Sequence, residues 1–314
     1  MRDDNQEPGR SRSTSMANQP HRPVSRRIQL STGLTYHLLE WGGDDPALTH
    51  TVVLVHGFLD YAHTWDDTVA AGLAGRFHLI APDLRGHGDS DRVGAGGYYH
   101  FMDYLADLHD VIAQLGRQRV SLVGHSMGGS VVGYYAGSFP ERVHRLALLE
   151  GLGPPEAEHM TFPERIRSWL AAWERVQKLP PRRYRSVEEA AARLLKTDSR
   201  LSPELALRLA RQGTTVGPDG TYQFKHDPLH TTPGPYPFSV NAASQFWQQV
   251  RCPVLVVDAA ESDFHLAPED TARRLAAFSR AASLKQERLP AAGHMMQRHQ
   301  PAALAKLLLH FLAD

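Results

Sequence analysis

Cysteine is almost absent from this chain of 314 residues, which contains only Cys252. A single thiol cannot form a disulfide within the chain, and it cannot provide the several thiolates of a structural zinc site. Proteins of reducing compartments commonly keep their few cysteines as free thiols. We therefore expect a cytoplasmic protein whose fold depends on an ordinary hydrophobic core, and we expect no metal and no cofactor.

An excess of charge of one sign is also absent, because 34 Lys and Arg residues balance 34 Asp and Glu residues. Sequence-independent binding of DNA or RNA depends on clustered cations, so we expect no nucleic-acid partner. Long hydrophobic runs are missing too. Candidates such as 51–55 and 254–257 have the length of a strand, whereas a spanning helix needs roughly 18 residues. We therefore expect no membrane span.

From residue 28 onward, short apolar runs alternate with stretches of helix length. Such alternation is typical of a mostly parallel sheet with helices on both faces, so we expect an α/β fold. Residues 1–27, by contrast, are rich in Arg, Ser, Pro, Asn and Gln and have almost no large apolar side chains, which predicts a disordered tail. The expected strands are 28–30, 35–41, 51–55, 78–81, 120–123, 143–149 and 254–257.

The alternation stops between about residues 151 and 250. Three helical patterns and a stretch rich in Pro, Gly and aromatic residues replace it, and the sheet resumes at Pro253. We therefore expect a core of 28–150 and 251–314 that is interrupted by a mainly helical cap, 151–250. Residues 164–211 of this cap contain 12 basic and 6 acidic residues. Solvated helix faces explain this excess, but a basic cap could also attract anionic esters.

A Gly-x-Ser-x-Gly motif occurs at Gly124-His125-Ser126-Met127-Gly128. It directly follows an expected strand and begins a segment that reads as a helix, which is the arrangement of a nucleophile elbow. The tight turn forces Ser126 into a strained backbone conformation, and Gly124 and Gly128 leave room for it. We therefore expect Ser126 to be the catalytic nucleophile.

A serine hydroxyl needs a base within hydrogen-bonding distance, and that base needs an orienting acid. His294 lies in a Gly-containing loop before the last helical pattern, so we expect it to be the base. The acid should follow a later strand, and Asp263 lies just beyond the end of the strand 254–257. Asp263 is thus the expected acid, while Glu150 and Asp258, which each end a strand, remain alternatives.

An oxyanion hole requires two main-chain N–H groups near the nucleophile. Met127 begins the helix after the nucleophile, so its N–H is one candidate. The segment His56-Gly57-Phe58 follows an early strand, where the second donor is expected, and Gly57 allows a close approach of the main chain. We therefore expect the N–H groups of Phe58 and Met127 to bind the developing negative charge.

Two further polar segments have simpler explanations than catalysis. The segment 83–90 is dense in Asp, Gly, His and Ser, which are residues that build turns. His226, Asp227 and His230 have the side chains of metal ligands, but they lie in one Pro-containing loop without a fourth ligand. We expect turn building from the first segment and no metal at the second.

Four motifs follow one another along the chain: HGF at 56–58, DLRGHGDS at 83–90, GHSMGG at 124–129 and GH at 293–294. With these motifs in this order, the chain resembles the α/β-hydrolase family over about residues 27–314. The resemblance implies a triad of Ser126, His294 and Asp263, an oxyanion hole at Phe58 and Met127, and a helical lid after the sixth strand. The chain departs from the family pattern at Asp258-Ala259-Ala260, where the acid strand usually ends in glycine. Segments 56–65 and 148–155 also resemble bacterial members called serine hydrolase-like proteins.

Serine at position 126 argues against the haloalkane dehalogenase and epoxide hydrolase branches, which resemble this fold but have aspartate there. Acyl transfer by Ser126 is then the expected type of reaction. We expect a hydrolase that cleaves a carboxylic ester through an acyl-enzyme on Ser126, with a small acyl compound and water as its partners. The family resemblance also permits thioester, amide and carbon-carbon bond hydrolysis and cofactor-free perhydrolysis. A ligand receptor or binding protein with little turnover is the alternative of another class.

Overall fold

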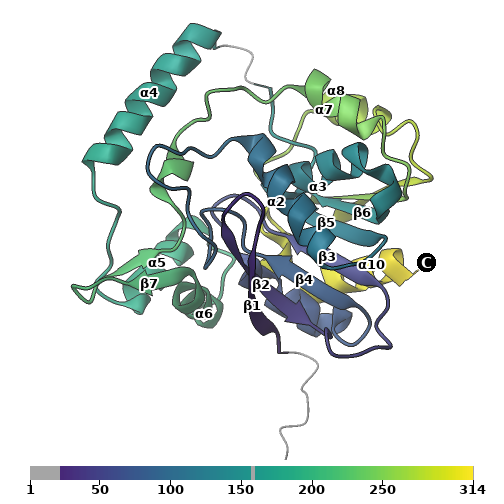
Figure 1. Ribbon diagram of the computed structural model, residues 1–314, viewed down its shortest axis with the longest axis horizontal. Coiled ribbons are helices and arrows are strands. Elements are labelled where there is room, and N and C mark those ends of the chain that lie inside the picture. Colours follow the sequence, from purple (N-terminus) through teal and green to yellow (C-terminus); the bar gives the residue numbers. More distant parts are fainter. Residues whose placement is uncertain (1–21, 157–159, 314) are drawn as a thin grey trace, which may run out of the picture.

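A computed structural model describes residues 22–156 and 160–313. Its main feature is an eight-stranded sheet with the strand order β1-β2-β4-β3-β5-β6-β9-β10 (Figure 1). The pairs β1–β2 and β2–β4 are antiparallel, and the other neighbours are parallel, so the expected α/β class is confirmed. The strands are β1 (Val24–Gln29), β2 (Thr35–Trp41), β3 (Thr51–Val55), β4 (His78–Pro82), β5 (Val120–His125), β6 (Val143–Leu149), β9 (Val254–Ala259) and β10 (Leu284–Leu289).

The two edges of the sheet differ from the expectation. β1 begins at Val24, so residues 24–27 belong to a strand and not to the tail, while residues 1–21 lie outside the described part of the chain. β10 was not expected at all. Five of its six residues are exposed, and it pairs with β9 on one side only. An edge strand of this kind lacks the apolar run that identifies a buried strand.

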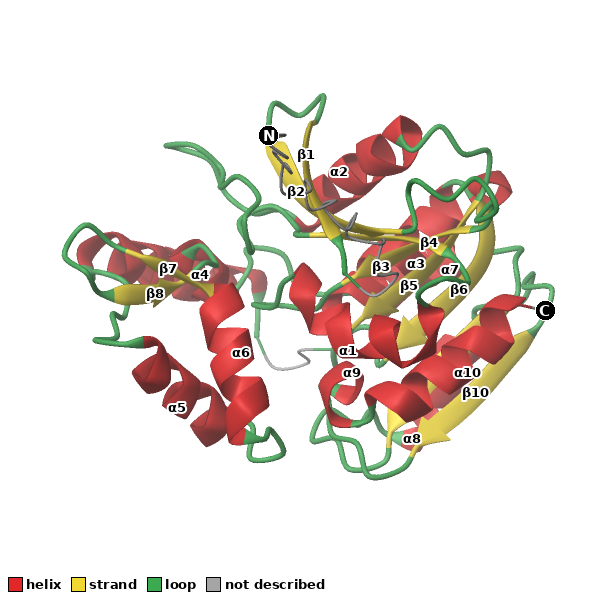
Figure 2. Cartoon of the chain, turned by 90° about the horizontal axis from the view of Figure 1, so that it is seen from below, coloured by secondary structure: helices red, strands yellow, loops and turns green. Residues whose placement is uncertain are grey.

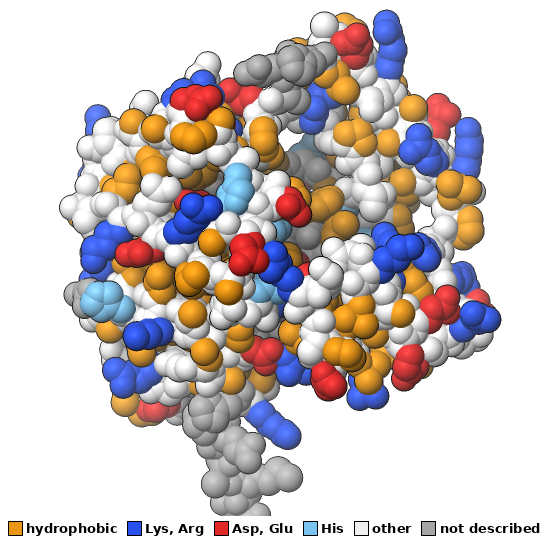
Figure 3. All heavy atoms as spheres, turned by 180° about the vertical axis from the view of Figure 1, so that it is seen from behind, with side chains coloured by type: hydrophobic (Ala, Val, Ile, Leu, Met, Phe, Trp, Pro, Cys, Tyr) orange, Lys and Arg blue, Asp and Glu red, His pale blue; other side chains and the backbone are white. Residues whose placement is uncertain are grey.

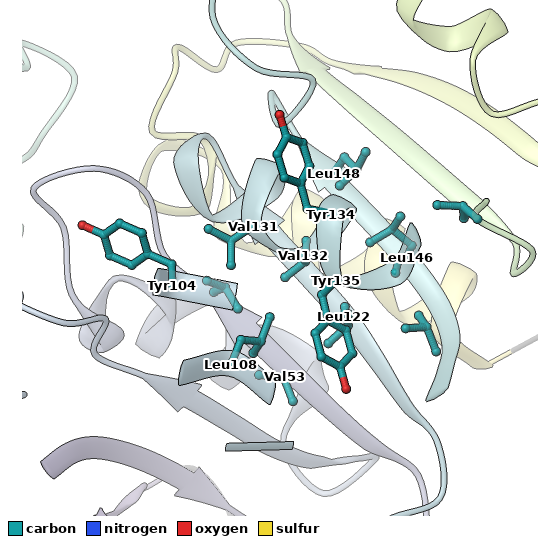
Figure 4. Close-up of a cluster of buried hydrophobic side chains, with 14 of the residues drawn as sticks. Val53, Tyr104, Leu108, Leu122, Val131, Val132, Tyr134, Tyr135, Leu146 and Leu148 are labelled. Atoms are coloured by element: carbon teal, nitrogen blue, oxygen red, sulfur yellow. The ribbon is translucent and has the colours of Figure 1, made fainter. Parts of the chain in front are cut away.

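Helices cover both faces of the sheet (Figure 2). Successive strand residues point to opposite faces, so Val53 and Val55 of β3 pack into one hydrophobic cluster while Val52 and Leu54 pack into the other. The first cluster joins the sheet to α2 (Phe101–Gln114), α3 (Met127–Ser138) and α7 (Val240–Trp247), and Figure 4 shows part of it. The second joins the sheet to η1 (Ala62–Trp65), η2 (Val69–Leu73), α9 (Met296–His299) and α10 (Pro301–Ala313).

The chain leaves the sheet after β6 and returns at β9. We call residues 160–239 the insert. Ser186 and Ser202 cap α5 and α6 by accepting main-chain N–H groups three residues on, and Thr161 and Glu164 form a capping box at α4. The elements of the insert are α4 (Phe162–Lys178), α5 (Val187–Thr197), α6 (Pro203–Gly213), β7 (Thr214–Val216), β8 (Tyr222–Phe224) and η4 (Pro228–Thr231).

The insert has a small hydrophobic cluster of its own, formed by α5, α6 and the β7–β8 hairpin. Tyr61 of the core joins this cluster, and its hydroxyl donates to the Leu209 carbonyl at 2.6 Å. α4 has no buried residue and stands apart in Figure 1, but Tyr98 of the core stacks on its Trp173. α7 behaves differently, because its Trp247 lies in the core cluster. The expected cap, 151–250, thus includes one helix that packs with the core.

The remaining short elements are α1 (Asp66–Thr68), η3 (Pro140–Arg142) and α8 (Pro268–Ala276). α8 follows the loop after β9 and packs its Leu275 against the first hydrophobic cluster. Among residues 22–156 and 160–313, no helix has both the length and the apolar character needed to cross a membrane.

Candidate active site

Ser126 lies in the turn between the end of β5 and the start of α3. Its φ of 53° and ψ of −118° fall outside the regions that residues with a side chain normally occupy. The neighbouring backbone holds this conformation, because the Ser126 N–H donates to the Leu149 carbonyl and the Gly129 N–H donates to the Ser126 carbonyl, both at 2.9 Å. A strained residue fixed in this way between a strand and a helix is typical of a functional site.

Gly124 and Gly128 allow α3 to approach the sheet closely. A Cβ atom on Gly124 would lie 2.4 Å from the Gly128 carbonyl oxygen, and one on Gly128 would lie 2.4 Å from the His56 carbonyl oxygen. Both contacts are with backbone atoms that cannot rotate away. Any side chain at either position would therefore push α3 away from β3 and β5 and move the turn that contains Ser126.

His294 is the histidine whose side chain contacts the Ser126 hydroxyl. It follows β10 in the loop before α9, and its Nε2 lies 3.0 Å from Ser126 Oγ. The rings of Phe264 and His125 lie against the His294 ring, with centroid distances of 4.3 and 4.7 Å. His125 Nε2 also donates to the His294 carbonyl at 2.8 Å, and burial lowers the pKa of His125, which favours its neutral form. The two ring contacts and the hydrogen bond to its main chain thus hold His294 in position.

Glu150 is the carboxylate that contacts His294. It follows β6 with a φ of 45°, and its Oε2 lies 2.5 Å from His294 Nδ1. Its side chain is only 5% exposed, and it accepts further hydrogen bonds from the Ala259 N–H at 3.1 Å and the Ser262 hydroxyl at 2.8 Å. Burial alone would raise the pKa of Glu150, but the bonds from His294, Ser262 and Ala259 outweigh it and lower the pKa. The carboxylate is therefore charged at neutral pH.

Asp263, the acid expected from the sequence, does not contact His294. Its side chain is exposed, whereas the residue before it donates to Glu150 and the ring of the residue after it covers His294. The expected pairing of Asp263 with His294 is therefore corrected to a pairing of Glu150 with His294. The other alternative, Asp258, accepts a hydrogen bond from Gln286 at 2.7 Å, and burial raises its pKa.

The loop after β3 lies directly beside the nucleophile. A Cβ atom on Gly57 would lie 2.8 Å from His125 Nδ1 and 3.2 Å from Ser126 Cβ, so Phe58 follows a point of very close approach. Within the described residues, the main-chain N–H groups of Phe58 and Met127 donate to no protein acceptor. Met127 is the first residue of α3, where such free N–H groups and the positive end of the helix dipole attract a negative charge.

The sequence reasoning missed the contribution of His87 to this loop. Its Nε2 accepts the N–H of Leu59, the residue after Phe58, at 3.2 Å, while its Nδ1 donates to the Arg85 carbonyl at 3.0 Å. Burial lowers the pKa of His87, which keeps Nε2 available as an acceptor. The segment 83–90 does build turns, since Asp83 accepts the N–H groups of Ala62 and Asp89. The same segment also fixes the loop beside Ser126.

The residues that could bind a metal are engaged in hydrogen bonds. In the described part of the chain, ligand atoms of His37, Asp83 and Asp89 lie within 4.8 Å of one another. His37 already contacts Asp83 at 2.7 Å, and Asp89 pairs with Lys225. The loop with His226, Asp227 and His230 forms no such group among the described residues, and Asp227 accepts a bond from the Tyr99 hydroxyl.

Two cavities flank the site. One, of about 690 Å³, is lined by Glu150, Phe264, Leu266 and residues of α8 and β10. The other, of about 570 Å³, lies between the insert and the loop after β3. The surface is hollowed between core and insert in Figure 3. Both volumes are in the range of pockets that hold small molecules.

Comparisons with known sequences identify the family of the chain. The family model of the alpha/beta hydrolase fold matches residues 50–298. A 3-hydroxybutyrate-oligomer hydrolase from Cupriavidus necator is 30% identical over 284 residues, which cover 87% of this chain and 90% of that protein. Human serine hydrolase-like protein 2 is 34% identical over 169 residues, or 52% of this chain. The chain spans 53% of that human protein and 33% of three uncharacterized mycobacterial proteins that are 40% identical over 120 residues.

Solved structures share the fold of this chain. A hypothetical protein from Pseudomonas aeruginosa superposes with a TM-score of 0.80 and 31% identity over 92% of this chain and 99% of that chain. A thioesterase domain from the curacin biosynthetic pathway superposes with a TM-score of 0.78 and 25% identity over 91% of this chain and 99% of that chain. The chain therefore belongs to the α/β-hydrolase family.

Proposed function

We propose that this protein is a hydrolase that cleaves carboxylic esters or closely related acyl compounds through an acyl-enzyme on Ser126. His294 is the general base, and Glu150 is the acid that orients it. The observation that carries the proposal is the continuous hydrogen-bonded chain from Ser126 Oγ to His294 Nε2, at 3.0 Å, and from His294 Nδ1 to Glu150, at 2.5 Å. A nucleophile, a base and an orienting group in this geometry are the parts that acyl transfer requires.

The first half of the reaction forms the acyl-enzyme. Ser126 Oγ attacks the acyl carbon while its proton moves to His294 Nε2, and the charged imidazolium is stabilised by the Glu150 carboxylate. The negative charge that develops on the acyl oxygen is bound by the N–H groups of Phe58 and Met127. The bond to the leaving group then breaks, and the leaving group takes the proton from His294.

The second half returns the enzyme to its starting state. A water molecule gives a proton to His294 Nε2 and attacks the acyl carbon of the Ser126 ester. The tetrahedral intermediate collapses, Ser126 Oγ recovers the proton from His294, and the carboxylic acid leaves. Glu150 remains ionised throughout, because hydrogen bonds from Ser262 and the Ala259 N–H support its charge in addition to His294.

Two relatives support an acyl substrate. The hydrolase from Cupriavidus necator is named for 3-hydroxybutyrate oligomers, and the curacin domain is named a thioesterase. Both names describe cleavage at an acyl carbon. The insert between β6 and β9 is the cap of this enzyme in our proposal, since it lies over the loop that contains Phe58 and Leu59 and forms one wall of a cavity there.

A fluorophosphonate probe tests the proposal. We expect the wild-type protein to be labelled at Ser126, the Ser126→Ala variant to remain unlabelled, and p-nitrophenyl esters to be hydrolysed only by the wild type. Labelling arises because the probe phosphorus is attacked by the activated hydroxyl. A receptor or binding protein without turnover would bind acyl compounds without Ser126-dependent labelling, so that outcome would overturn the proposal.

Gly57→Ala is expected to lower kcat by about 10² to 10³-fold, the effect of losing one oxyanion donor. The added methyl group would lie 2.8 Å from His125 Nδ1 and 3.2 Å from Ser126 Cβ, so the loop with the Phe58 N–H must shift. Phe58→Ala is the matched control, because its ring is 49% exposed and the proposed donor is its main chain. Steady-state kinetics on a p-nitrophenyl ester compare the two, and a larger loss from Phe58→Ala would contradict the assigned donor.

A further inference from the structure

The cavity between the insert and the core has a distinctive charge. We call it the insert pocket. Its floor includes Leu59 and Arg298 of the core, and its roof includes Arg175 of α4, Arg182 and Arg193. Its lining thus contains four arginines, and it contains no Asp or Glu. A concave surface lined by one sign of charge raises the local concentration of ligands of the opposite sign.

Three of the four arginines are available to a ligand. Arg298 is neutralised by an ion pair with the buried Asp60. In the described part of the chain, Arg175, Arg182 and Arg193 form no ion pair with a carboxylate. The guanidinium of Arg182 lies over the Tyr184 ring, 5.4 Å from its centroid, which leaves its N–H groups free for another acceptor.

Four other cations of the insert differ from these three, because they have carboxylate partners. Arg183 pairs with Asp219, Lys178 with Glu174, and Arg208 with Asp67. Glu189, whose pKa is lowered partly by Arg182, pairs with Arg185. Among the described residues, Arg175, Arg182 and Arg193 are thus unpaired arginines that line one cavity, whereas the unpaired Arg167 and Arg211 of the insert lie outside it.

The rest of the pocket is mainly apolar, although Thr197, Gln223, His226 and Thr231 also line it. Leu59 forms part of the floor, and Val176, Leu179, Leu194, Leu209 and Phe224 line the walls. An apolar wall with a few cationic groups suits a ligand that has a hydrocarbon part and an anionic end. Arginine is especially suited to such an end, because its planar fork of donors matches a carboxylate or a phosphate.

Two residues that line the insert pocket are close in sequence to the proposed catalytic residues. Leu59 follows Phe58, the proposed oxyanion donor, and Arg298 lies in α9, directly after the loop that contains His294. A ligand in the insert pocket therefore contacts the loop after β3, which lies beside the nucleophile. A substrate with its anionic end among Arg175, Arg182 and Arg193 would extend its chain over this loop.

We propose that the insert pocket binds the anionic end of the substrate, so that the enzyme prefers acyl compounds whose apolar chain ends in a carboxylate or a phosphate. The preference for turnover rests on the proposed function, whereas the binding of the anion does not require it. The insert then recognises the anionic end of the substrate in addition to covering the loop after β3.

Kinetics test the preference with a pair of matched substrates. The mono-p-nitrophenyl ester of adipic acid ends in a carboxylate, and p-nitrophenyl hexanoate has the same chain length without the charge. We expect the Arg175→Gln/Arg182→Gln variant to lower kcat/KM at least tenfold for the charged ester and less than twofold for the neutral one. An equal effect on both esters would overturn the proposal.

A second double variant controls for general attraction of anions. Arg167 and Arg211 are exposed residues of α4 and α6, and they neither line the pocket nor form an ion pair with a carboxylate among the described residues. Arg167→Gln/Arg211→Gln therefore also removes two positive charges from the insert, but from outside the pocket. We expect a change of less than twofold with the charged ester, and a tenfold loss would show that overall charge rather than the pocket attracts it.

Binding to the Ser126→Ala variant separates the pocket from the chemistry. Calorimetric titration with octanoate, octyl phosphate and neutral octanamide is expected to show binding of one or both anions that weakens at least tenfold when Arg175 and Arg182 become Gln. The tighter anion identifies the preferred end group. If all three compounds bind alike, the proposal is wrong. If the anions bind as expected but the wild type hydrolyses no ester, the proposed function fails while the pocket stands.

Discussion

Replacing Glu150 with Gln is expected to lower kcat by about 10⁴-fold, the effect of the equivalent change of carboxylate to amide in a serine protease. Gln has the same length as Glu but no charge, so it neither stabilises the imidazolium nor fixes the proton on His294 Nδ1. The carboxylate that it replaces lies 2.5 Å from that nitrogen and is also supported by Ser262 and Ala259. Stopped-flow or steady-state hydrolysis of an activated ester measures the loss.

Asp263→Asn provides the matched control for this prediction. Asp263 lies on the loop that contacts both Glu150 and His294, but its own side chain is exposed. We expect this variant to retain kcat within about twofold, because a change of charge at an exposed position has only a small effect. A large loss from Asp263→Asn together with an active Glu150→Gln would return the role of the acid to Asp263. Circular dichroism of both variants establishes that the fold is retained.

Ser126→Ala is expected to have the largest effect, a loss of about 10⁶-fold in kcat, as in a serine protease without its nucleophile. Removing Glu150 as well should add almost nothing, because residues that act as a unit are not additive. Rates of Ser126→Ala and Ser126→Ala/Glu150→Gln on the same ester give this comparison. Ser138→Ala, at the other end of α3, is the control and should retain full activity. A further large loss in the double variant would mean that Glu150 acts independently of Ser126.

Much of the sheet could be predicted from the sequence because its central strands are buried on both faces. β3, β5 and β9 read as short apolar runs bounded by polar or Gly-containing turns, and each lies where the pattern predicts it. β10 could not be found in this way, because an edge strand with mostly exposed residues has no apolar signal. Its position matters, since the loop that follows it contains His294.

The identity of the acid illustrates a different limit of sequence reasoning. β6 and β9 are parallel neighbours, with Leu149 beside Val257, so the residues after both strands emerge at the same edge of the sheet. Chain order cannot decide which of two carboxylates at that edge contacts the histidine. The decision depends on the loop after β9, which offers the Ser262 hydroxyl to Glu150. The positive φ of Glu150 was equally hidden, because glutamate, unlike glycine, rarely adopts that conformation.

The position of the insert also governs how the enzyme can change. The insert connects β6 and β9, which pair directly with Leu146 opposite Val254, so folding of the core must close a loop of about 100 residues. The entropy of such a closure depends only weakly on length, and doubling the loop costs about 0.6 kcal/mol. Elongation, shortening or recombination of the insert is therefore thermodynamically cheap. Substrate range can diverge by exchange of this one segment, while the residues around Ser126 stay under separate constraint.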